Sequence, residues 1–120
     1  NFNEIRENTA SYEEIYPGDD VVDILATDVY RGGFDPNDYN QLLALAGDKL
    51  IALGEVGTAP TPEKLREQSK WAWFMIWGIP NNPERVRAAR DIYDCNETLT
   101  WEELPWVKIK KPKIHYPILK

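Results

Sequence analysis

A glutamate flanked by glycines is the side chain of this sequence best suited to chemistry. Glu55 ends the apolar segment KLIALGEVG, where Gly54 and Gly57 let a ligand or another backbone approach closely. A carboxylate in such a position can act as a nucleophile, a base or an acid. The same position equally suits a strand-end glutamate that caps a loop amide or pairs with a cation such as Arg31. The residues alone leave both interpretations open.

Three more side chains end neighbouring apolar segments and are candidates for the same site. The hydroxyl of Tyr30 could orient Glu55, because adjacent parallel strands lie about 4.8 Å apart, although a buried structural tyrosine would look identical. Asp28 lies two residues before Tyr30 and therefore on the same face of the strand. It could be a second carboxylate of the site, but we favour a structural role as a hydrogen-bonding strut. Trp77 could stack on the apolar face of a sugar ring, and core packing is its alternative.

The sequence predicts no metal site and no cofactor. Cys95 is the only cysteine, and His115, the only histidine, lies in a lysine-rich tail far from any predicted strand end. The sequence therefore does not support a histidine metal site or a Ser-His-Asp catalytic triad. The acidic cluster of Asp19, Asp20 and Asp23 lacks the spacing of an EF-hand, so we interpret it as a solvated loop.

The elements that position these side chains are three short apolar segments, each followed by a helix signal. The segments are VVDILATDVY (21–30), KLIALGEVG (49–57) and WAWFMIWG (71–78). Their nearly continuous apolar character is typical of strands buried on both faces of a parallel sheet. A capping residue and a proline then predict a helix start at Asp35-Pro36, Thr61-Pro62 and Asn82-Pro83. We expect these helices to run to Gly47, to about Ser69 and through Tyr93.

Three strand–loop–helix units predict an α/β fold with parallel strands and right-handed crossovers. The absence of a glycine-rich phosphate loop favours a closed barrel over an open doubly wound sheet. A (β/α)₈ barrel needs about 250 residues, so 120 residues hold only part of one. We predict a connector over 1–20 with a short acidic helix ending at Tyr16, three barrel units over 21–104, and a basic extended tail over 105–120. One helical turn is expected at 100–103.

Charge and hydropathy exclude two classes of partner. The chain has 14 basic and 20 acidic residues and a net charge of -6, which disfavours binding to nucleic acid. No apolar run approaches the roughly 18 residues of a membrane span. We therefore expect a soluble chain with neither kind of partner.

These segments together resemble a known family. The run YPGDDVVDILATDVYRG, followed by LALAGDKLIALGEVG and then KWAWFMIWG, resembles the last three barrel strands of the β-mannanases of glycoside hydrolase family 26. The resemblance covers roughly residues 12–105. It implies that Glu55 is the nucleophile, that Tyr30 orients it, and that Trp77 forms the floor of the subsite for the attacked sugar.

The resemblance also implies the reaction. Retaining hydrolysis of β-1,4-mannosidic bonds needs Glu55 to attack the anomeric carbon while a second carboxylic acid, about 5.5 Å away, protonates the leaving oxygen. In the family that acid comes from the fourth strand and follows a histidine, and this chain contains neither. Asp28 neighbours the strand of the nucleophile and is no substitute. We therefore expect the chain alone to be weakly active or inactive.

Three hypotheses on function and partners follow. The chain is part of a glycoside hydrolase that acts on β-mannan together with a complementary N-terminal part of the barrel, or it is a non-catalytic sugar-binding piece, or it self-associates. Open sheet edges and an uncovered inner face favour pairing. By resemblance alone, the protein is expected to be secreted.

Overall fold

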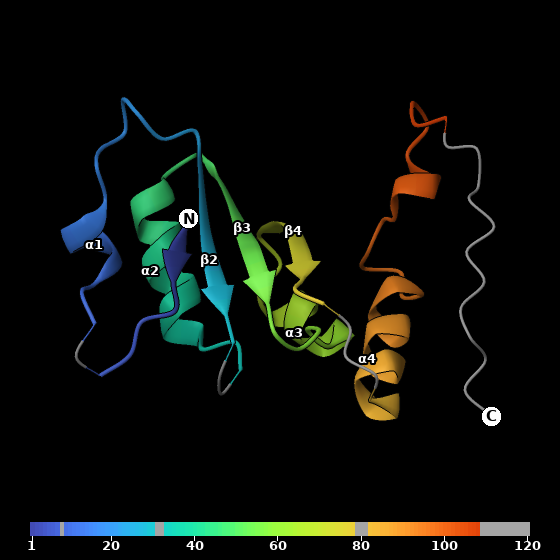
Figure 1. Cartoon of the computed structure of the whole chain (residues 1–120). Helices are drawn as coiled ribbons and strands as arrows, with labels where there is room; N and C mark the ends of the chain where they lie inside the picture. Colours follow the sequence, from blue (N-terminus) through green and yellow to red (C-terminus); the bar gives the residue numbers. More distant parts are fainter. Residues whose placement is uncertain (8, 31–32, 79–81, 109–120) are drawn as a thin grey trace.

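One parallel sheet forms the centre of the molecule. The computed structural model describes residues 1–7, 9–30, 33–78 and 82–108. Its strands, in the spatial order β1-β2-β3-β4, are β1 (Phe2–Asn3), β2 (Ile24–Val29), β3 (Leu50–Val56) and β4 (Trp71–Ile76). All neighbouring pairs are parallel. The three predicted strands are confirmed, and Figure 1 shows them side by side with their ends in the same direction.

The helices after β2, β3 and β4 begin at the predicted prolines and are α2 (Pro36–Ala46), α3 (Pro62–Glu67) and α4 (Pro83–Tyr93). The predicted short acidic helix before β2 is α1 (Tyr12–Ile15), and the 3₁₀ turn η1 (Trp101–Glu103) follows α4. The side chain of Asp35 accepts a hydrogen bond from the Asn37 amide at 2.8 Å, and Asn82 accepts one from the Glu84 amide at 2.9 Å. Each cap satisfies amides that lack a partner within the helix, with proline at the first helical position.

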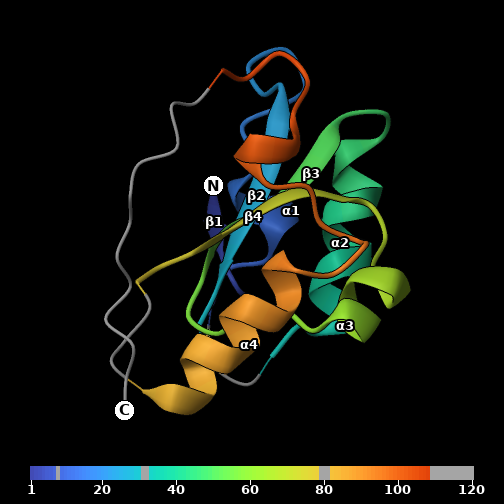
Figure 2. The same ribbon diagram turned by 90° about the vertical axis from the view of Figure 1, so that its right-hand side faces the viewer.

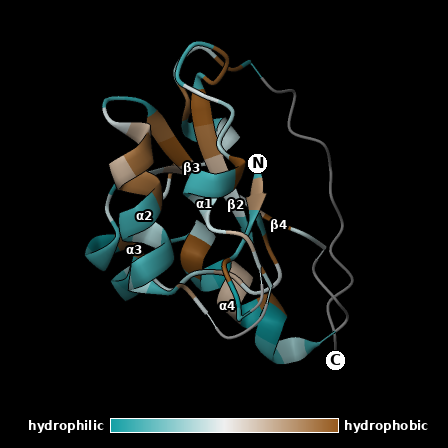
Figure 3. Ribbon diagram, turned by 90° about the vertical axis from the view of Figure 1, so that its left-hand side faces the viewer, coloured by the Kyte–Doolittle hydropathy of each residue, from teal (hydrophilic) through white to brown (hydrophobic). Residues whose placement is uncertain are grey.

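One face of the sheet packs against helices and forms the core. Leu25 of β2 and Ile51 of β3 are buried together with Leu42 of α2 and Tyr12 of α1. The Tyr12 hydroxyl is 2.9 Å from the Thr27 hydroxyl, so the polar groups of this buried pair satisfy each other. Figure 2 shows α2 and α3 on the same side of the strands, and Figure 3 shows brown, apolar strands behind largely teal helices. We call this helix-covered face the outer face.

The opposite face, which we call the inner face, carries large apolar side chains that the described residues leave partly exposed. Trp73 and Met75 of β4 remain 44% and 38% exposed. Ile24 and Leu50, at the starts of β2 and β3, are exposed as well. Soluble domains seldom leave such a face open, so it is a surface suited to contact with further protein.

The structure adds one strand that the sequence did not predict. β1 lies within residues 1–20, which we interpreted as a connector, and pairs with β2 through Phe2 opposite Thr27 and Asn3 opposite Asp28. Two residues are too few for any periodic pattern, so only tertiary contacts reveal the strand. The ring centroids of Phe2 and Tyr12 lie 5.1 Å apart, which anchors β1 on the outer face.

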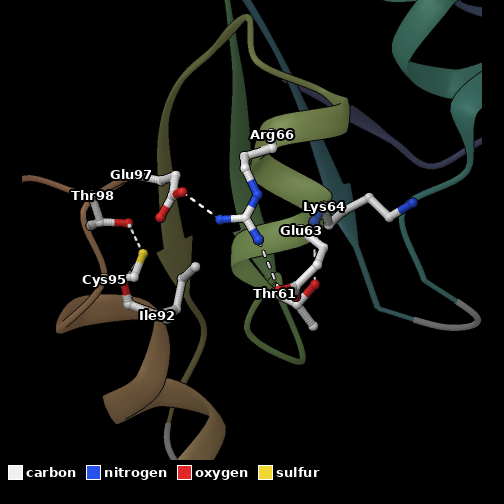
Figure 4. Close-up of polar contacts among 8 residues, drawn as sticks. All are labelled: Thr61, Glu63, Lys64, Arg66, Ile92, Cys95, Glu97 and Thr98. Atoms are coloured by element: carbon white, nitrogen blue, oxygen red, sulfur yellow. Dashed lines mark hydrogen bonds and ion pairs between the residues drawn. The ribbon is translucent and has the colours of Figure 1, made fainter.

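The segment after α4 is joined to α3 by polar contacts. Arg66 of α3 makes ion pairs with Glu63 of the same helix and with Glu97 beyond α4 (Figure 4). The sulfur of Cys95 lies 3.1 Å from the carbonyl oxygen of Ile92. The predicted turn at 100–103 is confirmed as η1. Most of the predicted basic tail, including His115, lies outside the described residues.

Candidate active site at the carboxyl ends of the strands

A bulge in β3 turns Glu55 toward the inner face. Thr27 pairs with Leu53 but the next residue, Asp28, pairs with Glu55, so β3 carries one extra residue at Gly54. In a regular strand Leu53 and Glu55 would share a face, and Val56 would point the other way. The bulge instead leaves Leu53 and Val56 both buried in the outer core and places Glu55 beside Asp28. Neither composition nor periodicity predicts this irregularity.

Gly54 lies in close contact with two side chains at the bulge. A Cβ atom on Gly54 would collide with the side chain of Asn1 and lie 3.0 Å from the Oδ1 of Asp28. The atoms that approach Gly54 thus belong to protein side chains, whereas the sequence led us to expect a ligand or another backbone.

Tyr30 donates a short hydrogen bond from its hydroxyl to the Oε2 of Glu55. Partial desolvation of the phenol, then the hydrogen bond and negative charge of Glu55, raise the pKa of Tyr30 to about 12. Tyr30 therefore stays protonated and remains a donor throughout the neutral range. A carboxylate with a fixed donor on one oxygen has its orientation set while its other oxygen stays available. Arg31, the alternative partner of Glu55, lies outside the described residues.

Asp28 lies next to this pair and is bonded to the N-terminal residue. It pairs in register with Glu55 across the two strands. The side-chain amide of Asn1 donates to the Oδ1 of Asp28 at 2.7 Å. This contact agrees with the interpretation of Asp28 as a hydrogen-bonding strut.

Trp77 follows β4 directly and is 60% exposed. Its backbone amide donates to the carbonyl of Val56 at 2.9 Å, which ties it to the residue after Glu55. Trp77 therefore lies outside the core that the described residues form. An exposed indole at the end of the strand next to that of Glu55 can stack on a flat apolar ligand surface.

Glu4 is a part of the site that the sequence did not point to. It is only 5% exposed, although it follows β1 at the same edge of the sheet. Its backbone amide donates to the carbonyl of Asp28 at 3.0 Å, and its carboxylate accepts from the backbone amide of Tyr30 at 3.3 Å and from Arg6. Glu4 thus holds β2 on both sides of Val29, and no local pattern could have shown this.

The acidic loop after α1 has a structural explanation. Asp19 accepts hydrogen bonds from Lys49 and from the hydroxyl of Tyr16, the latter at 2.7 Å. These bonds, that of Lys49 first, lower the pKa of Asp19. Within the described part of the chain no group of three or more histidine, cysteine, aspartate or glutamate side chains could hold a metal ion. None of the helices described there is long and apolar enough to cross a membrane.

Comparison with known proteins gives consistent matches. The model of glycosyl hydrolase family 26 matches residues 2–103. A mannan endo-1,4-beta-mannosidase from Thermothelomyces thermophilus is 43% identical over 97 residues, which are 74% of this chain and 20% of that enzyme. The chain thus spans about a fifth of the length of this curated relative.

Two solved structures match the fold. GH26A from Muricauda sp. MAR_2010_75 superposes with a TM-score of 0.74 at 44% identity, over 85% of this chain and 35% of that protein. A GH26-CBM35 β-(1,4)-mannanase from Podospora anserina superposes with a TM-score of 0.68 at 42% identity, over 87% of this chain and 24% of that protein. The parallel α/β arrangement is therefore that of a segment of these enzymes.

Proposed function

The chain belongs to glycosyl hydrolase family 26, and from that premise we propose that it carries the nucleophile of a retaining β-mannanase. Glu55 is the proposed nucleophile, and Tyr30 its orienting donor. The observation that carries the proposal is the hydrogen bond from the Tyr30 hydroxyl to Glu55 at the carboxyl ends of adjacent strands. Reactive groups in parallel barrels gather at this end.

The two oxygens of Glu55 suit different tasks in this proposal. Oε2 accepts from Tyr30, so Oε1 attacks the anomeric carbon of a mannosyl unit and forms a covalent glycosyl–enzyme intermediate. The glycosidic oxygen leaves with a proton from a second carboxylic acid. The second residue, now a carboxylate, then takes a proton from a water molecule. That water attacks the anomeric carbon, which breaks the bond to Glu55 and regenerates its carboxylate.

Trp77 is the proposed platform for the attacked sugar, and Asp28 a polar substrate contact. The exposed indole supports stacking against the apolar face of a mannose ring. Asp28 lies opposite Glu55 across the strands and retains acceptor capacity beyond its bond to Asn1. A polymeric substrate supports the further proposal that the protein works outside the cell.

We propose that the acid/base residue comes from protein beyond these 120 residues. Residues 21–104 would be the last three units of a (β/α)₈ barrel, with 105–120 as its tail. The uncovered inner face with Trp73 and Met75 supports this proposal, as does the 20–35% share of the relatives that the chain covers. The partner is a complementary N-terminal part of the barrel, covalently joined or supplied separately.

Mannan hydrolysis with and without that partner tests the proposal. The chain is incubated with galactomannan, alone and with the N-terminal part of a family 26 barrel, and reducing ends are measured. We expect release only from the mixture, with a loss of about 10³-fold or more in Glu55→Gln. Glu102→Gln, which changes an exposed glutamate of η1, is the matched control. Equal activity of Glu55→Gln and Glu102→Gln would disprove the role of Glu55.

The exposed apolar side chains of the inner face favour a second candidate function, that of a non-catalytic mannan-binding or self-associating unit. Trp73, Met75 and Trp77 are all exposed on or beside β4. Calorimetry with a mannan oligosaccharide and light scattering of the chain alone distinguish these cases. Binding of the oligosaccharide without hydrolysis, both by the chain alone and by the chain with the N-terminal part, supports the function of a mannan-binding unit. A stable monomer in light scattering counts against self-association.

A further inference from the structure

Arg85, in the first turn of α4, reaches across to the loop that follows Glu55. Its Nη2 atom donates to the carbonyl of Gly57 and lies 3.3 Å from the Thr58 hydroxyl. Its backbone amide donates to the capping side chain of Asn82 at 3.2 Å, which holds the start of the helix in place. The arginine therefore joins the start of α4 to the end of β3 through a backbone group.

Gly57 is in turn the backbone against which Tyr30 rests. Its amide donates to the carbonyl of Val29 at 2.9 Å, one residue before Tyr30. A Cβ on Gly57 would lie 2.9 Å from the Cδ1 of the Tyr30 ring and 3.4 Å from its Cα. No ordinary side chain fits in that space, so the glycine backbone itself supports the ring. A shift of Gly57 must therefore move the phenol whose hydroxyl contacts Glu55.

Arg85 also lies close to the segment that carries Trp77. It lines a small pocket together with Gly57, Thr58 and Gly78, the residue after Trp77. Trp77 is bonded to Val56, the residue before Gly57, so both backbones converge at this point. One guanidinium thus lies where the ends of β3 and β4 meet.

We propose that Arg85 is a positioning residue, which holds the Gly57 backbone in place and so keeps the Tyr30 hydroxyl on Glu55. Its catalytic consequence rests on the proposed function of Glu55, whereas its geometric consequence does not. Arginine suits this role because the two N–H groups of its Nη2 atom can donate to a carbonyl and a hydroxyl at once, and the planar guanidinium fixes their directions. Lysine has enough donors for both acceptors, but its shorter, freely rotating ammonium group lacks that fixed geometry.

The geometric part is tested by NMR on the chain itself. The exchange of the Tyr30 hydroxyl proton with water is measured at low temperature in Arg85→Met, with Tyr30→Phe to assign the signal. We expect exchange at least about tenfold faster than in the parent, because the charge-assisted hydrogen bond from Tyr30 to Glu55 is loosened. Tyr12, bonded to Thr27 in the outer core, is an internal reference whose exchange stays unchanged.

Two further variants keep the test decisive. Arg87→Met removes an exposed arginine from the same helix and is expected to leave Tyr30 unaffected. Arg85→Lys keeps the charge and is expected to give an intermediate rate, which decides the case should Arg85→Met not fold. An unchanged Tyr30 exchange rate in folded Arg85→Met, or in Arg85→Lys where only that variant folds, would overturn the proposal.

Kinetics of the complemented enzyme separate this proposal from the proposed function. Arg85→Met is expected to lower kcat about tenfold at little change in KM, with partial recovery in Arg85→Lys. A purely structural role would lower the fraction of active enzyme without changing kcat per active site. Faster hydroxyl exchange with unchanged kcat would support the proposal that Arg85 positions Tyr30. It would contradict the proposed catalytic role of Glu55 instead.

Discussion

The two faces of the sheet are built from side chains of the same strands, yet they differ in which groups cover those side chains and bond to them. On the outer face, Leu25 and Leu53 are buried by helices or by neighbouring strands, and Thr27 finds a hydroxyl partner in Tyr12. On the inner face, the described residues leave Tyr30 40% and Trp73 44% exposed. The outer face therefore stabilises the chain by itself, while the inner face holds groups that become useful only with a ligand or further protein.

Two tryptophans on one strand offer the largest contrast between the faces. The Trp71 ring lies 5.1 Å from that of Tyr39 on the outer face, and its Nε1 donates to Gln68 at 2.9 Å. Trp73, two residues later, is 44% exposed on the other face, because the pairing of β4 with β3 shifts register between Ile51 and Leu53. We expect Trp71→Gln to lower the free energy of unfolding by about 3 kcal/mol, and Trp73→Gln by less than about 1 kcal/mol. Urea unfolding followed by circular dichroism measures both.

Each tryptophan variant is the control for the other, because the substitution and the strand are the same. Equal losses of stability would show that the inner face contributes to the fold as much as the outer face. The contrast between the faces would then be wrong.

Tyr30→Phe should separate chemistry from stability on the inner face. The variant removes the donor to Glu55 but keeps the ring that rests on Gly57. We expect kcat in the complemented enzyme to fall about 10- to 100-fold, the value of one charge-assisted hydrogen bond. Thermal unfolding should stay unchanged, since no buried group is left without a partner. The matched variant Tyr12→Phe in the outer core should show the reverse, with loss of stability by about 1 kcal/mol and unchanged kcat.

The outer face was more predictable from the sequence than the inner face, for physical reasons. Apolar runs and proline caps are local signals, so strands near Leu25 and Ile51 and helix starts such as Asp35-Pro36 could be predicted closely. The positions of Glu55, Tyr30 and Trp77 at strand ends could also be predicted. The contacts that hold these side chains could not, because the bulge at Gly54 depends on pairing between strands.

The unpredicted residues share one property. Asn1, Glu4 and Arg85 act through contacts with residues 26 or more positions away in the chain, such as Asp28, Tyr30 and Gly57. Contacts over such separations carry no periodic or motif signal. β1 was missed for the same reason, since its two residues are a strand only by virtue of their pairing with β2.

A buried carboxyl on the outer side gives the next smaller effect. Burial, and then the negative charges of Asp35 and Glu4, raise the pKa of Asp38 to about 6, while a hydrogen bond from the Ile5 backbone opposes the shift. The folded state thus binds the proton more tightly than the unfolded state, with its ordinary pKa near 3.8. The contribution of Asp38 to stability is therefore full below about pH 4 and is lost as the pH rises through about 6.

Asp38→Asn should therefore stabilise the chain at pH 7 by about 1–2 kcal/mol, after allowance for solvent screening, and flatten the dependence between pH 4 and 6. Urea midpoints measured across this range check it. Asp48→Asn, in the turn before β3, is the control and should leave the slope as it is. The raised pKa of Asp38 would be contradicted by one result. In it, the stability of the parent rises from pH 4 to 6, and Asp38→Asn makes that rise steeper.

The smallest effect is expected where the outer helices meet solvent. The ion pair of Arg66 with Glu97 links α3 to the segment after α4, but the guanidinium is 52% exposed and Glu63 is a second partner (Figure 4). Exposed pairs gain little, because water screens the charges and two long side chains lose freedom. We expect Glu97→Gln to cost less than about 0.5 kcal/mol, with a difference from the parent that shrinks further in 1 M salt. A loss comparable to that of Trp71→Gln would show that polar links between helices, as well as apolar contacts on the strands, stabilise the outer side.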